Sequence, residues 1–131
     1  MVIYRNVFPV VISFILLIQT DNMSRLVCDN FGYLHHLCYC SPHQRTFLLA
    51  SASPEQVHAI CEVCSNLAKG TIPLTQVQNK RLRNHADSIR DLANSSIPFK
   101  TKKQILTQHG GGTVVSDVMY SLKTALKPFF L

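Results

Sequence analysis

Apolar residues recur at spacings of three and four along residues 54–69, which is the pattern of an amphipathic helix. The apolar positions are Val57, Ile60, Cys61, Cys64, Leu67 and Ala68. Ser53 is a favourable N-cap, Pro54 suits the first helical position, and Gln56 completes a capping box. Gly70 follows as a natural helix stop. The pattern therefore predicts a helix over residues 54–69 with one buried face.

Comparable start signals precede this helix. Asn30 is a suitable N-cap for a helix over residues 31–39. Ser41 and Pro42 repeat the combination of a cap and a first-position proline, and they predict another helix over residues 42–50.

Three more helices are expected on the C-terminal side of Gly70. Thr75 and Gln78 form another capping box, which opens a basic helix through about residue 84. Apolar spacing predicts the other two over residues 86–94 and between Phe99 and Gly110. Nowhere do β-branched residues alternate with polar ones, so no sheet is predicted. We expect an all-α fold, a compact bundle of about five short helices plus a C-terminal amphipathic helix.

The C-terminal segment is set apart by three consecutive glycines. Residues 110–112 are interpreted as a hinge, since glycines sustain a helix poorly. In residues 113–131 an apolar stripe at helical spacing is formed by Val115, Val118, Met119, Leu122, Ala125, Leu126 and Phe129. A helix from residue 113 through about Lys127 reaches roughly 20 Å, too short to cross a bilayer. The stripe is suited to a membrane surface or a protein partner, or to folding back as the last core helix.

The first 22 residues also form a separate segment. Arg5 precedes the apolar run 7–18, as in a secretory signal, but the residues that follow make a poor cleavage site. Met23 offers a second interpretation, in which translation begins there, and a structural N-terminal helix is a third. The chain thus divides into an apolar segment (1–22), a basic helical module (23–109), the glycine hinge (110–112) and an amphipathic tail (113–131).

Positive charge is concentrated in one part of the module. The 131 residues include 13 Lys and Arg against 7 Asp and Glu, for a net charge of +6. Within 24 positions, where only Asp87 and Asp91 oppose them, lie Lys80, Arg81, Arg83, Arg90, Lys100, Lys102 and Lys103. This segment carries +5 of the total, which favours an anionic partner.

DNA is the partner that this basic segment indicates first. If four or five of its side chains neutralise phosphates, raising salt from 50 to 200 mM weakens duplex binding by about two to three decades. No aromatic residue interleaves with Lys80 to Arg90, so base stacking has little support. We expect non-specific binding to the phosphate backbone.

The five cysteines allow more than one interpretation. Cys38 and Cys40 form one close pair and Cys61 and Cys64 another, with several histidines nearby, so a zinc site is conceivable. Disulfides are an alternative, although an odd count fits a complete framework poorly. Because Cys61 and Cys64 share the apolar stripe of their helix, packing in the core is favoured.

Catalytic signatures are lacking in this sequence. No spacing singles out a cysteine, a histidine and a third group that orients the base, and the carboxylates are sparse. The three glycines at 110–112 are not followed by the Gly-Lys-Ser/Thr of a phosphate loop. We therefore expect a non-enzymatic protein without cofactor, metal or small-molecule substrate.

Several short stretches of the chain resemble one protein family. They are Ala52-Ser53-Pro54-Glu55-Gln56, Ile60-Cys61-Glu62, Leu67 to Gly70, Ile72-Pro73-Leu74-Thr75 and Gln108-His109-Gly110-Gly111, with a Lys/Arg-rich helix between the last two. Over roughly residues 33–112 their order is similar to that of a small basic protein encoded by polintons and adintoviruses, which are large DNA transposons and related integrated viruses.

This resemblance implies a virion or transposon protein that starts near Met23. It also implies a loose relation to the DNA-condensing core proteins of adenovirus-like particles. The expected partners are then DNA and viral structural proteins or a membrane surface, in the nucleus or the virion. If residues 1–22 act as a signal peptide, the protein is instead a small secreted helical protein.

Overall fold

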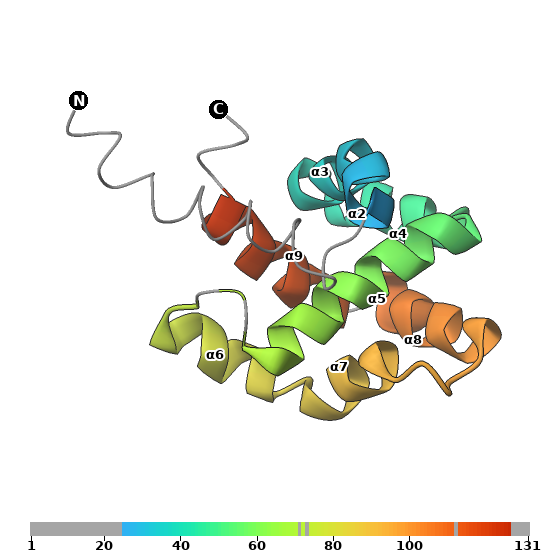
Figure 1. The fold of residues 1–131 in the computed structure, drawn as a ribbon. Helices are drawn as coiled ribbons and strands as arrows, with labels where there is room; N and C mark the ends of the chain where they lie inside the picture. Colours follow the sequence, from blue (N-terminus) through green and yellow to red (C-terminus); the bar gives the residue numbers. More distant parts are fainter. Residues whose placement is uncertain (1–24, 71, 73, 112, 127–131) are drawn as a thin grey trace.

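The long helix α5 (Pro54–Lys69) runs through the middle of the molecule, and the other helices lie around it (Figure 1). They are α2 (Arg25–Asp29), α3 (Phe31–Tyr39), α4 (Pro42–Ala50), α6 (Gln76–Arg83), α7 (Ala86–Ala93), α8 (Phe99–Gly111) and α9 (Thr113–Leu126). This computed structural model describes residues 25–70, 72, 74–111 and 113–126, without the side chains of residues 109–111, 113 and 122–126.

The all-α prediction is confirmed, since the described residues form eight helices and no strand. The expected count of about five helices plus the tail was too low. One addition is α2, a helix of five residues that is too short to show a periodic pattern in the sequence. The expected apolar segment 1–22 lies outside the described residues. None of the described helices is long and apolar enough to span a bilayer.

Capping boxes set the start of three helices. Gln56 N donates to Ser53 Oγ at 3.2 Å, and Ser53 N donates to Gln56 Oε1 at 2.9 Å. Thr75 and Gln78 form the same reciprocal pair at the start of α6, and so do Ser41 and Gln44 at the start of α4. Each box satisfies two backbone N–H groups that the first turn leaves without partners.

At its other end, α5 stops at Gly70, as predicted. This residue has φ of 75°, the left-handed conformation that glycine adopts without steric cost. The backbone therefore turns away from the axis of α5 at Gly70.

Asn30 precedes α3 as predicted, but its side chain does not cap that helix. Its Nδ2 instead donates to the carbonyl oxygen of Leu26 at 2.8 Å. The backbone of Asn30 has φ of −104° and ψ of 16°, whereas a capping side chain requires an extended backbone. Because α2 runs directly into α3, the Asn30 side chain serves the end of α2.

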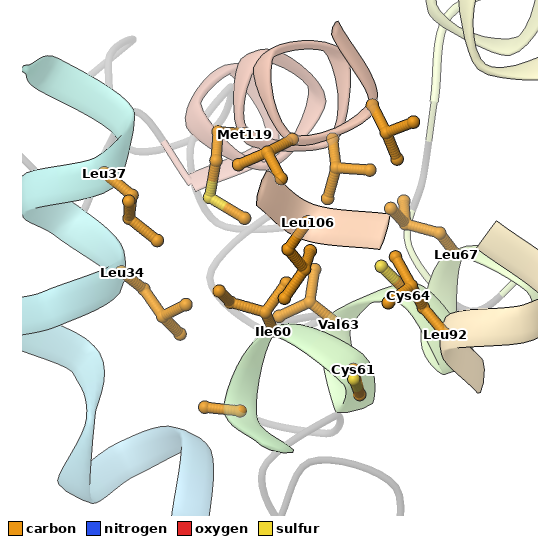
Figure 2. Packing of buried hydrophobic residues seen from close by; sticks show 14 of the residues in the cluster. Leu34, Leu37, Ile60, Cys61, Val63, Cys64, Leu67, Leu92, Leu106 and Met119 are labelled. Atoms are coloured by element: carbon orange, nitrogen blue, oxygen red, sulfur yellow. The ribbon is translucent and has the colours of Figure 1, made fainter. Parts of the chain in front are cut away.

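The core is formed by buried side chains from α5 and from the seven helices around it. Figure 2 shows Leu34 and Leu37 of α3, Leu92 of α7, Leu106 of α8 and Met119 of α9 around the buried face of α5. All of these side chains are buried. Helix α9 joins this core through α3, where Cys38 Sγ lies 3.6 Å from the carbonyl oxygen of Met119.

The glycine hinge differs from its prediction. Helix α8 continues through Gly110 and Gly111, and α9 begins at Thr113 after a single residue that is not described. Two of the three residues of the expected hinge, Gly110 and Gly111, are therefore part of a helix. Since α9 is buried against α3, the tail belongs to the same core as the basic module.

Candidate nucleic-acid interface

The seven predicted basic residues do not form one surface. Lys80, Arg81 and Arg83 lie on α6 and Arg90 lies on α7. The three lysines 100, 102 and 103 lie on α8, which Figure 1 shows on the other side of α7 from α6. The sequence segment with +5 charge is thus divided between two regions of the molecule.

Two of the lysines on α8 are not available to a large ligand. Lys102 is only 7% exposed. Lys103 is half-buried, and its Nζ donates to the carbonyl oxygen of Ala52 at 3.2 Å, which ties α8 to the start of α5. Lys100 is exposed but isolated from the cations of α6. The contribution of α8 to a DNA-binding surface is therefore small.

Arg81 has partners within the protein. Its Nε lies 3.8 Å from Asp117 Oδ1 of α9, and its guanidinium carbon lies 4.8 Å from the centre of the Tyr120 ring. The same carboxylate contacts His85, whose Nε2 lies 2.7 Å from Asp117 Oδ2. Arg81 thus helps to attach α6 to α9, and part of its charge is neutralised there.

Arg90 has a weaker partner. Its Nη1 donates to Asp87 Oδ1 at 3.3 Å, one turn earlier in α7. Both side chains are highly exposed, at 74% and 95%, and such surface pairs contribute little. Arg90 can therefore exchange this contact for a phosphate at small cost.

One face of α6 has a uniform chemistry. Gln76, Asn79, Lys80 and Arg83 are spaced as i, i+3, i+4 and i+7, and together they line a shallow surface groove of about 380 Å³. Helix α6 contains no acidic residue, and among the described residues no carboxylate pairs with Lys80 or Arg83. The face therefore presents amide and cationic donors to solvent.

A second pocket adjoins this face at Arg83. Its apolar lining comes from α5, α6, α7 and the segment before α6, and it consists of Leu67, Ala68, Leu74, Leu82, Ala86 and Ile89. Its polar lining consists of Asn79, Arg83 and Arg90. The pocket has a volume of about 270 Å³. Arg83 and Arg90 thus line the same pocket although they are seven positions apart and lie on different helices, which brings the cations of α6 and α7 together.

The tail residues predicted to meet a membrane or partner are placed differently. Val115, Val118 and Met119 are each only 1% exposed, because they face the core. This corresponds to the alternative in which the tail folds back as the last core helix. The side chains of Leu122 and Leu126 and the whole of Phe129 lie outside the described residues.

The cysteines are free thiols, and the favoured prediction for Cys61 and Cys64 is confirmed because both are buried. Burial raises the pKa of each of these two thiols. The positive charge of Lys102 opposes this effect and lowers the pKa of both thiols. In the described part of the chain, no three histidine, cysteine or acidic side chains are grouped so as to hold a metal ion.

Asp117 and the burial of Lys102 were missed by the sequence reasoning. Asp117 lies 36 positions after Arg81, and only the return of α9 onto α6 brings the two together. One sequence feature could have indicated that Lys102 is buried. It precedes Leu106, which is buried, by one helical turn and therefore lies on the same face of α8.

Comparison with known proteins adds no relative: no family model, no curated protein and no solved structure matches this chain. The resemblance to the polinton and adintovirus protein remains a prediction.

Proposed function

We propose that this chain is a non-enzymatic nucleic-acid-binding domain that contacts the phosphate backbone of DNA through α6 and the adjacent part of α7. The observation that carries the proposal is the face of α6 formed by Gln76, Asn79, Lys80 and Arg83, which presents donors and no carboxylate. Phosphate oxygens are acceptors with negative charge, so this chemistry is complementary to a nucleic-acid backbone.

The number of phosphate contacts is smaller than the sequence suggested. Lys80 and Arg83 have no ion pair among the described residues, and Arg90 has only an exposed one. If these three side chains each neutralise one phosphate, raising salt from 50 to 200 mM weakens duplex binding roughly forty-fold. Arg81 adds less, because Asp117 and Tyr120 already hold it.

Such a domain suits a protein that coats DNA without reading its sequence. The resemblance to the polinton and adintovirus protein agrees with this role. The role would then be performed in the virion or in the nucleus. The alternative role through the tail has less support, because Val115, Val118 and Met119 are already used by the core.

A salt titration of duplex binding by the full chain tests the proposal. The full chain is required, because removal of α9 would expose the core. The variant that carries Lys80→Glu and Arg83→Glu should bind at least tenfold more weakly than the native chain at 50 mM salt. The matched control Lys100→Glu together with Lys69→Glu makes the same change of charge on α8 and at the end of α5, and it should reduce affinity far less.

Equal losses in the two variants would show that only net charge matters and would remove the assignment to α6. No binding by the native chain at 50 mM salt would overturn the proposed function. A second duplex of unrelated sequence, bound with equal affinity, is the result expected for backbone contacts.

A further inference from the structure

A pocket between α5, the end of α7 and the start of α8 is lined by a lysine that is largely buried. The pocket has a volume of about 380 Å³, within the range of small-ligand sites. It is lined by Leu26, His58, Cys61, Glu62, Ser65, Leu92, Ala93, Ser95 and Lys102. None of the four cations assigned to the nucleic-acid interface lines it, so the pocket is a separate feature of the molecule.

Helix geometry explains why this pocket exists. His58, Cys61, Glu62 and Ser65 occupy positions i, i+3, i+4 and i+7 of α5 and therefore share one face. Figure 2 shows Cys61 on a different side of α5 from Ile60 and Val63, which point into the core. The end of α7 and the start of α8 close the pocket on its other side.

Lys102 is the distinctive group in this pocket. It is only 7% exposed, and among the described residues no carboxylate, hydroxyl or carbonyl accepts a hydrogen bond from its ammonium. A buried ammonium without a partner is costly, so proteins rarely retain one. No buried nitrogen in the described structure lacks both a partner and solvent contact, so the Lys102 ammonium contacts solvent, and the Lys102 side chain also lines this pocket.

The start of α8 adds to the positive potential at this position. Lys102 is the fourth residue of α8, and the first turn of this helix contains no acidic residue. The N-terminal end of a helix carries a partial positive charge, which disfavours a buried lysine and favours an anion. The ring of Phe99, the first residue of α8, meets the ring of His58 edge-on at 6.2 Å, which holds this helix end against the pocket face of α5.

Glu62 is the one carboxylate among the lining residues, and it forms no ion pair with Lys102. While burial raises the pKa of the Cys61 thiol, the Lys102 ammonium lowers it, and Cys61 lines the same pocket. Among the described residues, Lys102 therefore has no ion-pair partner, although Glu62 lines the same pocket.

We infer that this pocket binds a small molecule through a single oxyanion group, a carboxylate or a phosphate, which pairs with the Lys102 ammonium. Ser65 and Ser95 line the same pocket and supply hydroxyl donors, and Leu92 and Ala93 form an apolar wall for a short carbon chain. The bound anion supplies the partner that the fold withholds from Lys102.

Titration of the ¹⁵N-labelled full chain with inorganic phosphate and with butyrate, at constant ionic strength, tests this inference. We expect saturable shifts of the amide signals of Cys61, Ser65 and Lys102 with at least one of the two probes, at dissociation constants in the millimolar range. The probe that binds identifies the oxyanion. Absence of saturable shifts with both probes up to about 100 mM would overturn the inference.

Two variants separate the site from general electrostatics. Lys102→Met removes the ammonium and should weaken binding by about tenfold or more. Lys100→Met makes the same change at an exposed position of the same helix turn and should leave binding within about twofold. Equal effects of the two variants would contradict the assignment to Lys102.

Thermal unfolding without added anion gives an independent readout. If Lys102 serves ligand binding, Lys102→Met should raise the melting temperature, because it removes a charge that has no partner among the described residues and lies on a side chain that is only 7% exposed. A lower melting temperature with unchanged anion binding would show a structural role and overturn the inference. Should Lys102→Met fail to fold, Ser65→Asp places a carboxylate in the pocket instead, and retained anion binding in that variant would likewise count against the site.

Discussion

His85 Nε2 lies 2.7 Å from Asp117 Oδ2, and this contact joins the turn between α6 and α7 to helix α9. The same carboxylate lies 3.8 Å from Arg81 Nε. Both His85 and Asp117 are largely buried, at 15% and 22% side-chain exposure, so the interaction is shielded from solvent. One acidic residue of the tail therefore fixes the position of the helix proposed to bind DNA.

Asp117→Asn should destabilise the protein by about 1.5 kcal/mol, because it removes the charge that attracts both Arg81 and His85. The matched control is Asp87→Asn, whose partner Arg90 is highly exposed, and it should cost less than about 0.5 kcal/mol. Urea denaturation of the two variants measures the difference. Similar costs for the two substitutions would show that the contacts of Asp117 add nothing beyond a surface ion pair.

The same Asp117→Asn variant should bind duplex DNA more tightly than the native chain, provided that it is folded. The substitution removes a negative charge beside α6 and releases Arg81 from its ion pair. Fluorescence anisotropy at 50 mM salt measures the change. A loss of affinity in the folded variant would indicate that the position of α6, set by Asp117, matters more than the freed charge.

Tyr33 should make the protein sensitive to alkaline pH. Burial raises its pKa from 10.0 to about 12, and its hydroxyl donates to the carbonyl oxygen of Leu48 at 3.0 Å. Between these two pH values the folded state retains a proton that the unfolded state releases, so stability falls as pH rises through this window. Urea midpoints measured from pH 8 to 12 should show this decline.

Tyr33→Phe should lower stability by about 1 kcal/mol near neutral pH, since the hydrogen bond to Leu48 is lost. It should also flatten the alkaline decline, because the buried phenol is gone. Tyr39→Phe removes a phenol that is 46% exposed and serves as the control. Identical alkaline slopes for Tyr33→Phe and the native chain would refute the role of Tyr33.

Two glycines should respond in opposite directions to alanine. Gly70→Ala should destabilise by about 1 kcal/mol, because alanine at φ of 75° is strained even though its Cβ would meet no atom within 4 Å. Gly32→Ala should stabilise by about 0.5 to 1 kcal/mol, because Gly32 lies within α3 and its added Cβ also meets nothing. Thermal unfolding of both variants gives the two signs, and a shared sign would contradict the backbone argument.

The thiols should react with an alkylating reagent in order of their exposure. Cys28 is exposed and should react first, whereas Cys64 is buried and its raised pKa keeps it protonated. Mass spectrometry of the native protein after timed alkylation identifies each modified residue. Cys28→Ser should remove the fast phase, and rapid modification of Cys64 in the folded chain would contradict its burial.

Local sequence signals were sufficient to place most of the helices. The start of α4 at Pro42 and that of α5 at Pro54 follow from cap residues whose hydrogen bonds close within three positions. The end of α5 follows from Gly70 for a similar reason. Asn30 was predicted to cap α3, but an asparagine side chain can also bond to the end of the preceding helix. Because α2 precedes it, Asn30 donates to the carbonyl oxygen of Leu26 instead.

The basic segment was less well predicted as a site. Its charge is a property of composition, but its availability depends on which helix face each residue occupies and on what packs there. Lys102 was counted as a surface cation, and the structure buries it beside α5. Arg81 was expected to face DNA, and α9 returns to hold it.

The sequence by itself determined the all-α class, most of the helix boundaries and the burial of the α5 stripe apart from Ala68, because caps and apolar periodicity act over one or two turns. Only the tertiary structure decided that the tail enters the core, that four of the seven cations share one region and that Lys102 lines a pocket. These features depend on contacts between residues far apart in the chain, such as Arg81 with Asp117, and no local pattern encodes which helices meet.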